Sequence, residues 1–265
     1  MILSVVIITR NEEANIGRTL ASVQPLVADG KGEIIVVDSG STDRTVGIAK
    51  SCGARVFAEE WKGYAAQKNS AIDKTTGDWI LSLDADEEVE PGLSHEVDEA
   101  TRGCVPVDSP ERSFVAFWIP RKNLFLGRWI RHGGFWPDPK LRLFRKGAAR
   151  FEMRAVHEDA KLIEGISGKF QNALIHHSYP TLADYIDHMN HYSFLGAEMA
   201  VAKGHRRFSL FNILLRPLAT FLYNYIFRLG FLDGREGLLL HLYHAVYVSW
   251  KYAKAWELAR KKELT

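Results

Sequence analysis

The chain has 265 residues, of which 46% are hydrophobic and 25% charged, so it can bury a core and does not have the composition of a disordered protein. Cys52 and Cys104 are too few for a disulfide framework and lack metal-ligand spacing, so the cysteines favour a reducing compartment and exclude a disulfide-stapled fold. The net charge of +2 hides an asymmetry, because residues 1–100 carry 9 Lys/Arg against 18 Asp/Glu, whereas residues 203–265 carry 11 against 4.

The first hundred residues alternate between apolar runs of β type and helical segments. The first run, Leu3–Ile8, is short and β-branched and lacks a preceding basic region, so it predicts a strand and not a signal peptide. The predicted strands are residues 3–8, 33–37, 55–57 and 79–83, and the predicted helices are residues 13–23, 43–51 and 64–72. This alternation predicts a parallel sheet that binds its ligand beyond the carboxyl ends of the strands.

Polar residues cluster directly after three of these strands. The clusters are Thr9-Arg10-Asn11-Glu12, residues 38–43 (DSGSTD), and the carboxylates Asp84, Asp86, Glu87 and Glu88. Each cluster has a structural alternative. Ser41, Thr42 or Asp43 could cap the next helix, and the carboxylates could mark a helix start around Pro91, stabilised by the helix dipole. An acidic N-terminal part with polar strand ends also suggests cation binding.

The segment Asp84-Ala85-Asp86 lies where the fourth predicted strand ends. We expect its two carboxylates to point to different sides of the chain, so that one can reach a ribose while the other reaches a metal. A hard divalent cation such as Mg²⁺ is usually held at a diphosphate by one or two carboxylates and phosphate oxygens. The spacing therefore favours a site for a metal and a diphosphate over a simple helix start.

The middle of the chain predicts two further strands around a long loop. After a linker-like stretch at residues 101–113, the apolar runs at residues 114–119 and 140–144 read as strands. The loop between them, residues 121–139, is rich in Arg, aromatic residues and Gly. It is either an ordinary surface loop or a contact for ligands, since exposed Trp and Arg stack on sugars and bind phosphates.

Four segments together resemble a known family. They are SVVIITRNEEANIGRTLASV, IIVVDSGSTDRT, GYAAQKNSAI and GDWILSLDADEE, and in this order and spacing they are similar to the nucleotide-sugar half of family 2 glycosyltransferases. The resemblance implies the GT-A fold, an α/β fold with a Rossmann-like mixed, mostly parallel sheet flanked by helices. It implies a catalytic domain at residues 1–180, with a nucleotide-sugar half (1–100) and an acceptor half (114–180), followed by a helical region at 181–265.

The resemblance also implies roles for individual residues. Asp38 would accept a hydrogen bond from a uracil ring, Asp84 would hold the ribose, and Asp86 would bind Mg²⁺ or Mn²⁺. His176 resembles a strand-end histidine that completes the metal site in the family, although such a histidine can also be merely hydrogen-bonded. The other residues expected to bind the nucleotide are Thr9, Arg10, Asn11, Glu12, Ser39, Lys68, Asn69, Ala85 and Arg142.

The catalytic base is expected in a short acidic motif. An inverting transfer is a single displacement in which a base takes the proton from the acceptor hydroxyl. Val156-His157-Glu158 resembles the motif that bacterial lipopolysaccharide-core transferases of this family place after the acceptor strands. The resemblance favours Glu158 as the base, the adjacent Asp159 is the alternative, and a solvated loop pair without a role is the third possibility.

The C-terminal third is predicted to be helical and basic. Apolar residues recur at helical spacing over residues 182–189 and 208–225. Its longest charge-free stretch, residues 237–250, has 14 residues, whereas a spanning helix needs about 20, so any membrane contact would be peripheral. The mixture of aromatic and basic residues over 206–262 resembles an interfacial membrane anchor, and packing or homodimer formation is the alternative. Nucleic acid is not an expected partner, because no nucleic-acid-binding module is visible.

Residues 230–237 (GFLDGREG) and the helices around them resemble the C-terminal region of lipopolysaccharide-core glucosyltransferases. Together with the N-terminal motifs, they predict a metal-dependent inverting enzyme that moves a hexose, glucose by resemblance, from a UDP-sugar to a lipid-linked saccharide. Inner-core heptose is the expected acceptor, and the cytoplasmic face of the cell membrane is the expected location. The alternatives are a polyprenyl-phosphate glycosyltransferase and a non-catalytic, sugar-nucleotide-binding membrane scaffold.

Overall fold

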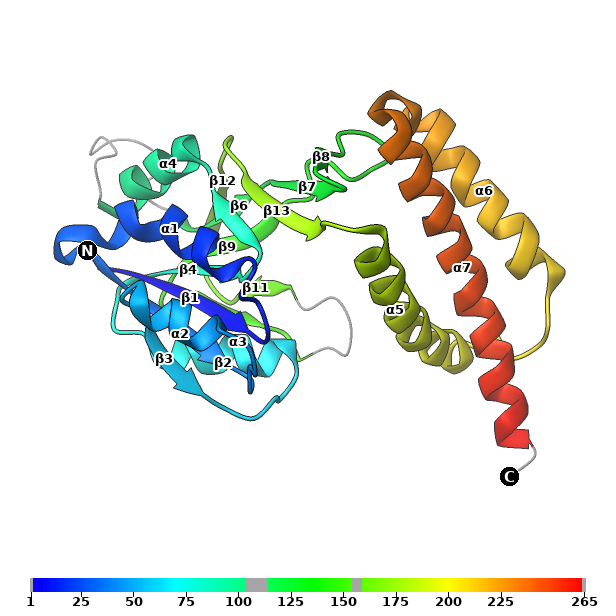
Figure 1. Ribbon diagram of the computed structural model, residues 1–265, viewed down its shortest axis with the longest axis horizontal. Helices are drawn as coiled ribbons and strands as arrows, with labels where there is room; N and C mark the ends of the chain where they lie inside the picture. Colours follow the sequence, from blue (N-terminus) through cyan, green and yellow to red (C-terminus); the bar gives the residue numbers. More distant parts are fainter. Residues whose placement is uncertain (1, 103–113, 154–158, 264–265) are drawn as a thin grey trace. The chain divides into compact units, whose positions relative to one another are not determined.

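The computed structural model describes residues 2–102, 114–153 and 159–263, and the chain folds into two compact units (Figure 1). Unit 1 comprises Met1–Arg121 and Asp138–His176, and unit 2 comprises Lys122–Pro137 and His177–Thr265. The chain passes between the units within β7 (Arg121–Phe125) and β13 (Leu174–Tyr179). Residues 122–137, which the sequence assigns to the acceptor half, thus group with the C-terminal helices.

Unit 1 is built on a seven-stranded mixed sheet with the order β12-β6-β9-β4-β1-β2-β3. Its strands are β1 (Leu3–Thr9), β2 (Gly32–Asp38), β3 (Arg55–Ala58), β4 (Trp79–Asp84), β6 (Phe114–Ile119), β9 (Lys140–Arg145) and β12 (Ile166–Lys169). β1 is parallel to β2 and β4, β2 to β3, and β12 to β6, whereas β9 is antiparallel to both of its neighbours. The mostly parallel sheet predicted from the sequence is confirmed.

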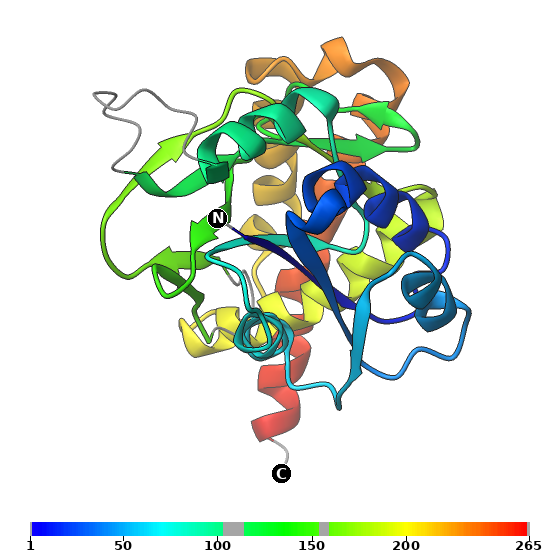
Figure 2. The same ribbon diagram turned by 90° about the vertical axis from the view of Figure 1, so that its left-hand side faces the viewer.

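Helices cover both faces of this sheet. They are α1 (Ile16–Val27), α2 (Thr45–Ser51), α3 (Tyr64–Asp73) and α4 (Pro91–Arg102), with a short η1 (Ala28–Gly30). Alternation along β1 sends Val5 and Ile7 into the core shared with α1, α2 and α4, and Val6 and Ile8 into the core shared with α3. Figure 2 shows α1 and α4 on one side of β1 and α3 on the other. Burial on both faces explains why β1 reads as a continuous apolar run.

The short strands depart from the predicted pattern. They are β5 (Glu87–Val89), β8 (Arg128–Trp129), β10 (Ala149–Phe151) and β11 (Ala160–Leu162). β5 pairs with β13, β10 with β11, and β7 with β8. The prediction of one long loop over 121–139 is wrong, because β7 and β8 form a hairpin whose two turn residues, Leu126 and Gly127, both have positive φ. Likewise Thr101 and Arg102 end α4 and are not linker, while 103–113 lie outside the described residues.

Unit 2 is helical apart from the β7–β8 hairpin and the end of β13, as the sequence predicts. Its helical elements are α5 (Leu182–Ala202), η3 (Phe211–Leu215), α6 (Arg216–Leu222), η4 (Tyr223–Phe227), η5 (Gly230–Asp233) and α7 (Gly234–Glu263). A capping box between Thr181 and Asp184 starts α5, which then packs along α7. In the part of the chain that the structure describes, no helix is both long enough and apolar enough to cross a membrane.

Asp233 joins the hairpin of unit 2 to the start of α7. Its carboxylate is 2% exposed and accepts hydrogen bonds from the backbone N–H groups of Arg131 (3.2 Å) and His132 (2.8 Å). The ring Nδ1 of His132 lies 3.0 Å from the same carboxylate. The aspartate of the GFLDGREG segment therefore fixes the loop that follows β8.

Asp233→Ala is expected to destabilise unit 2, because it leaves two backbone donors and an imidazole without their acceptor. The expected loss is about 2 kcal/mol or more of unfolding free energy, measured by urea denaturation of the full chain. Asp187→Ala is the matched control, since Asp187 is an exposed carboxylate on α5 and its removal should change stability by less than about 0.5 kcal/mol. Equal stability of the two variants would contradict the role assigned to Asp233.

Candidate active site

The three polar clusters predicted from the sequence lie at one edge of the sheet in unit 1. Strand register pairs Thr9 with Asp38 and Ile8 with Asp84, so β1, β2 and β4 end side by side. Carboxyl ends of parallel strands are where α/β sheets bind ligands. The parallel order alone therefore brings together residues from three distant segments of the sequence.

The loops after β1 and β2 are joined by hydrogen bonds. Asn11, whose φ is 55°, donates its backbone N–H to Ser41 Oγ (2.8 Å) and accepts the N–H of Thr42 on Oδ1 (2.8 Å). The carboxylate of Asp38 accepts from Gly40 N (3.0 Å), Ser41 N (2.9 Å) and Ser41 Oγ. Asp38 thus shapes its own loop, and its contact with a uracil ring stays a prediction.

Asp43 supports the alternative that this loop stabilises the start of the next helix. Its carboxylate accepts the backbone N–H of Thr45 (3.0 Å), in the first turn of α2, and that of Glu13 (3.2 Å). Helix starts are commonly stabilised by such side-chain acceptors. Part of the cluster at residues 38–43 therefore serves to hold the start of α2. Within this cluster, Ser39 stays a candidate for ligand binding, because its buried Oγ has no partner among the described residues.

Two buried hydroxyl groups at this edge have no partner among the described residues. They are Thr9 Oγ1, at the end of β1, and Ser39 Oγ, directly after β2. A buried polar atom without a hydrogen bond costs free energy unless a ligand or water satisfies it. Arg10, next to Thr9, is exposed. These residues fit a polar ligand such as a nucleotide.

Glu12 shows that the clusters face a common, negatively charged space. Its carboxylate accepts from Asn15 Nδ2 (2.9 Å), and its backbone N–H donates to Thr45 Oγ1 (2.8 Å). Burial raises the pKa of Glu12 and outweighs the hydrogen bond from Asn15. The negative charges of Asp86 and Asp84 raise this pKa further. A cation placed here would relieve the repulsion.

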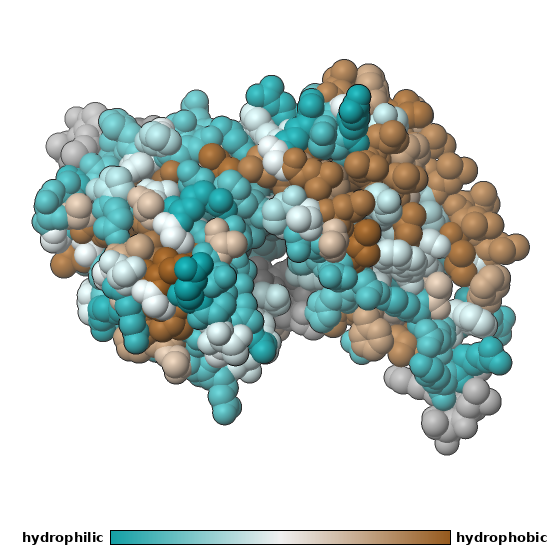
Figure 3. Space-filling model, in the orientation of Figure 1, coloured by the Kyte–Doolittle hydropathy of each residue, from teal (hydrophilic) through white to brown (hydrophobic). Residues whose placement is uncertain are grey.

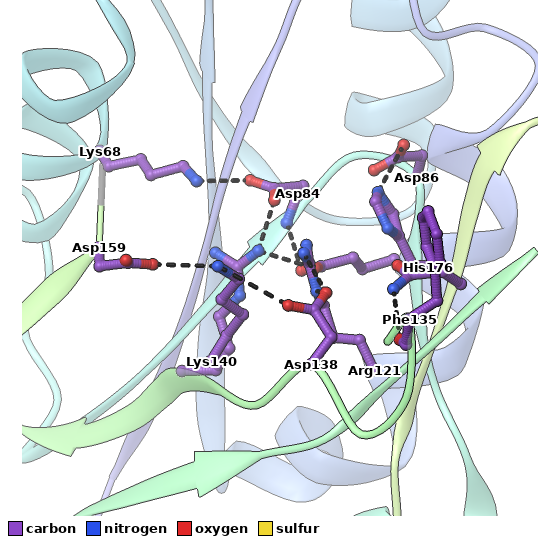
Figure 4. A network of polar contacts seen from close by, with 12 residues as sticks. Lys68, Asp84, Asp86, Arg121, Phe135, Asp138, Lys140, Asp159 and His176 are labelled. Carbon is purple, nitrogen blue, oxygen red and sulfur yellow. Dashed lines mark hydrogen bonds and ion pairs between the residues drawn. The ribbon is translucent and has the colours of Figure 1, made fainter. Parts of the chain in front are cut away.

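A buried ion-pair network lies at the end of β4, where Figure 4 shows Asp84 facing Lys68. Glu87 is the second carboxylate of this network. Asp84 contacts Lys68 Nζ at 2.7 Å and the guanidinium of Arg142, whose Nη2 lies 2.7 Å from Glu87 Oε1. Glu87 is 0% exposed and also accepts from Arg121 (3.1 Å) and from the backbone N–H of Asp84 (2.9 Å). Burial would raise the pKa of Asp84, but Arg142 and Lys68 hold it well below its usual range.

The chain turns at Ala85 and Asp86, which explains why the two aspartates diverge as expected. In a continuing strand, side chains two residues apart would share a face. The turn instead directs Asp84 toward Lys68 and Asp86 toward His176, as Figure 4 shows. The carbonyl of Ala85 accepts from Thr19 Oγ1 (2.7 Å), which fixes the turn against α1.

Asp86 and His176 form a pair of possible metal donors. His176 Nε2 lies 3.3 Å from Asp86 Oδ2. The prediction that His176 lies at a strand end is wrong, because His176 lies within β13. Its pairing with Glu87 of β5 places it beside Asp86. Burial lowers the pKa of His176, yet the carboxylate of Asp86 more than compensates and leaves the pKa raised. Burial raises the pKa of Asp86, and His176 reverses this shift so that the pKa is lowered.

This donor set fits a divalent ion that takes further ligands from a substrate. Within the described ranges, no group of three or more His, Cys, Asp and Glu side chains could hold a metal ion by itself. A carboxylate oxygen and an imidazole nitrogen suit Mn²⁺ or Mg²⁺, and diphosphate oxygens commonly supply the remaining ligands. The protein thus offers part of a coordination sphere that a nucleotide diphosphate would complete.

Of the two candidate catalytic bases, the structure describes Asp159 but not Glu158. Glu158, with Val156 and His157, lies outside the described residues. Asp159, the alternative, is half exposed, and its Oδ1 lies 3.1 Å from Lys140 Nζ. The choice between Glu158 and Asp159 therefore stays a prediction.

Asn69 has a structural partner. Its amide donates to the carbonyl of Phe151 (2.9 Å) and accepts the N–H of the same residue (3.0 Å). Both side-chain groups thus hold β10 against α3. Lys68, the preceding residue, lies over the Phe151 ring, 5.1 Å from its centroid, and reaches Asp84 from there. Nucleotide contact by Asn69 stays a prediction.

Sequence reasoning gave no role to Glu87 or Arg121, although both are central to the network. Arg121 bridges Glu87 and Asp138, with Nη2 2.6 Å from the Asp138 carboxylate. Glu87 lies in a three-residue strand that contains two glutamates, and glutamate is depleted in strands. No periodic signal could have indicated that Glu87 is buried.

Glu87→Gln is expected to lower the free energy of unfolding by about 3 kcal/mol, because Arg121 and Arg142 would lose a buried countercharge. Glu88→Gln is the matched control, since Glu88 pairs with Arg18 near the surface and should cost less than about 1 kcal/mol. Urea denaturation of both variants measures the difference. A Glu87→Gln protein as stable as the control would show that the network does not depend on this charge.

Comparison with known proteins agrees with this geometry. Residues 4–158 match the family model described as glycosyl transferase family 2. An uncharacterized glycosyltransferase of Rickettsia typhi is 30% identical over 272 residues, which cover 99% of this chain and 87% of that protein. The lipopolysaccharide core biosynthesis glycosyltransferase LpsC of Rhizobium meliloti is 30% identical over 263 residues, covering 96% and 92%.

A solved structure extends the comparison to the fold. The mannosyltransferase PcManGT from Pyrobaculum calidifontis, in complex with GDP-Man and Mn²⁺, aligns with a TM-score of 0.52 and 17% identity, covering 98% of this chain and 86% of that one. At this identity the likeness concerns the fold alone, and it confirms the predicted GT-A class with its helical C-terminal region. The chain belongs to glycosyl transferase family 2 and is a glycosyltransferase.

Proposed function

We propose that the enzyme transfers a hexose, with inversion, from a UDP-sugar to a lipid-linked saccharide, and that it uses a divalent metal ion. The observation that carries this proposal is the convergence of Asp84, Asp86, His176 and Glu12 at the carboxyl ends of β1 and β4. The similarity to the lipopolysaccharide core biosynthesis glycosyltransferase LpsC supports a lipopolysaccharide core saccharide as acceptor. Inner-core heptose as acceptor and glucose as the transferred sugar stay predictions from the sequence.

The donor nucleotide would lie along the edge formed by β1, β2 and β4. Asp84 would accept hydrogen bonds from the ribose hydroxyls, since its pKa is held low and an ionised carboxylate acts purely as an acceptor. The hydroxyls of Thr9 and Ser39, which have no partner among the described residues, would form hydrogen bonds with the nucleobase and the ribose. Arg142 and Lys68, both at Asp84, would bring positive charge near the diphosphate.

Asp86 and His176 would hold the metal ion beside the diphosphate. When bound, such an ion neutralises the charge that develops on the departing nucleotide diphosphate. PcManGT, which shares the fold, is in complex with a nucleotide sugar and Mn²⁺. The role of this chain's own residues is to orient the donor, because Asp86 and His176 are fixed by the turn after β4 and by the β5–β13 pairing.

The acceptor hydroxyl would lose its proton to Glu158, or to Asp159 if the motif is displaced by one residue. Lys140 Nζ lies 3.1 Å from Asp159 Oδ1, so this lysine lies next to the alternative base. The enzyme is proposed to work at the cytoplasmic face of the cell membrane, to which unit 2 would bind peripherally. The basic charge of residues 203–265 supports this location.

Asp86→Ala is expected to abolish the part of UDP binding that depends on Mn²⁺, because Asp86 would link the ion to the diphosphate. Isothermal titration of UDP with and without Mn²⁺ measures this directly. Asp73→Ala, which removes a carboxylate paired with Arg150 at the surface, is the control and should bind UDP like the native chain. Unchanged Mn²⁺ dependence in Asp86→Ala would rule out the proposed ion site.

Glu158→Gln keeps the size and polarity of the side chain but cannot accept a proton. The transfer rate is therefore expected to fall by roughly 10² to 10⁴, with UDP affinity nearly unchanged. If Asp159→Asn has this effect instead, the base is one residue further along. If neither variant is slowed, the acceptor needs no base, which would favour transfer to a polyprenyl phosphate. Steady-state rates for both variants decide among these outcomes.

A further inference from the structure

The segment Phe208–Leu232 of unit 2 exposes an unusual amount of apolar surface. Thirteen of its large hydrophobic residues are exposed, with exposed fractions from 37% to 76%. In Figure 3 the same region forms a continuous hydrophobic area over α6 and the neighbouring elements. Large exposed apolar patches are rare on monomeric soluble domains and usually mark a surface that another molecule covers. We call this surface the apolar face.

The apolar face arises because the helical segment from η3 to η4 has two different sides. One side packs toward α7, where Pro217 is buried and Ser249 Oγ donates to the carbonyl of Ile213 (3.0 Å). The other side carries Leu214, Leu218 and Leu222 at intervals of four residues, and all three are exposed. The segment already has its packing partner, so the exposed side is not needed for folding of unit 2.

Charge distinguishes this face from an ordinary protein interface. Residues 206–232 contain Arg206, Arg207, Arg216 and Arg228 but no acidic residue. Arg228 is exposed and lies over the ring of Tyr223 (5.0 Å to its centroid). Arg216 lies over Phe211 (5.9 Å) but also donates to the hydroxyl of Tyr252 on α7, so it belongs to the packed side of the segment. Arginines that lie along aromatic rings can keep their charge at the level of lipid headgroups while neighbouring side chains insert.

We infer that the apolar face inserts shallowly into a membrane that contains anionic lipid, with α6 lying in the plane of the interface. A second copy of the chain is a poorer occupant, because two such faces would bring arginines together without any carboxylate between them. The choice of lipid rests partly on the proposed function, since a lipid-linked acceptor places the enzyme at a membrane. The test, however, needs neither donor nor acceptor.

This inference differs from a purely electrostatic anchor in what it predicts. Inserted leucine and phenylalanine side chains bind any lipid, whereas exposed arginines bind only anionic lipid and are screened by salt. The full chain should therefore bind vesicles of phosphatidylcholine alone, bind more tightly when phosphatidylglycerol is added, and lose only that added part at high salt.

The decisive variant is Leu214→Gln/Leu218→Gln, which removes apolar surface without changing charge. The two leucines are 59% and 53% exposed, and glutamine is a good helix former, so the fold should be kept. The matched control is Ile163→Gln/Ile166→Gln in unit 1, where the isoleucines are 65% and 51% exposed. Vesicle flotation gives the partition coefficient, and circular dichroism with thermal unfolding checks that both variants remain folded.

The leucine variant should lose at least about tenfold in partition coefficient for both kinds of vesicle, while the isoleucine control binds like the native chain. Native-like binding by the leucine variant would overturn the inference, and so would a native chain that binds no vesicle. A leucine variant that converts a dimer into a monomer without lipid, with vesicle binding unchanged, would assign the face to a second copy. If the native chain binds vesicles but does not bind UDP, the proposed function is wrong and the membrane inference stands.

Discussion

The buried sharing of Arg142 between Asp84 and Glu87 is the interaction on which the candidate site depends. Buried charges are tolerated only when each has a partner of good geometry, so this group has to be complete to be stable. Its members come from α3, from the neighbouring strands β4 and β5, from the start of β7 and from β9, so four distant parts of the sequence contribute to it. The network therefore holds the end of β4 in place and couples the geometry of the site to the packing of unit 1.

The turn after β4 places the carboxylates of Asp84 and Asp86 in different environments. Asp84, on one side of the turn, contacts the cationic groups of Lys68 and Arg142, whereas Asp86, on the other side, pairs with the imidazole of His176. Two aspartates separated by a single alanine thus have different environments, which is why we propose different ligands for them, a ribose hydroxyl for Asp84 and a metal ion for Asp86. Unit 2 adds another kind of surface, where aromatic and aliphatic side chains face outward among arginines.

The sequence by itself determined the parallel half of unit 1. Apolar runs separated by helical segments predict parallel strands with one ligand-binding edge at their carboxyl ends. The sequence also indicated which polar residues lie at that edge, because they directly follow the predicted strands. Even the C-terminal helices followed from their periodicity. All these features depend on residues that are close in the chain.

Only the tertiary structure decided the features that depend on pairing between distant segments. β5 has three residues and two glutamates, so no local pattern predicts it, yet its pairing with β13 buries Glu87 and brings His176 to Asp86. The β7–β8 hairpin is local, but no sequence pattern indicated it, because β8 has two residues and so shows no apolar alternation. Which side of residues 208–232 stays exposed was decided by α7, since a helix buries whichever stripe its neighbour covers.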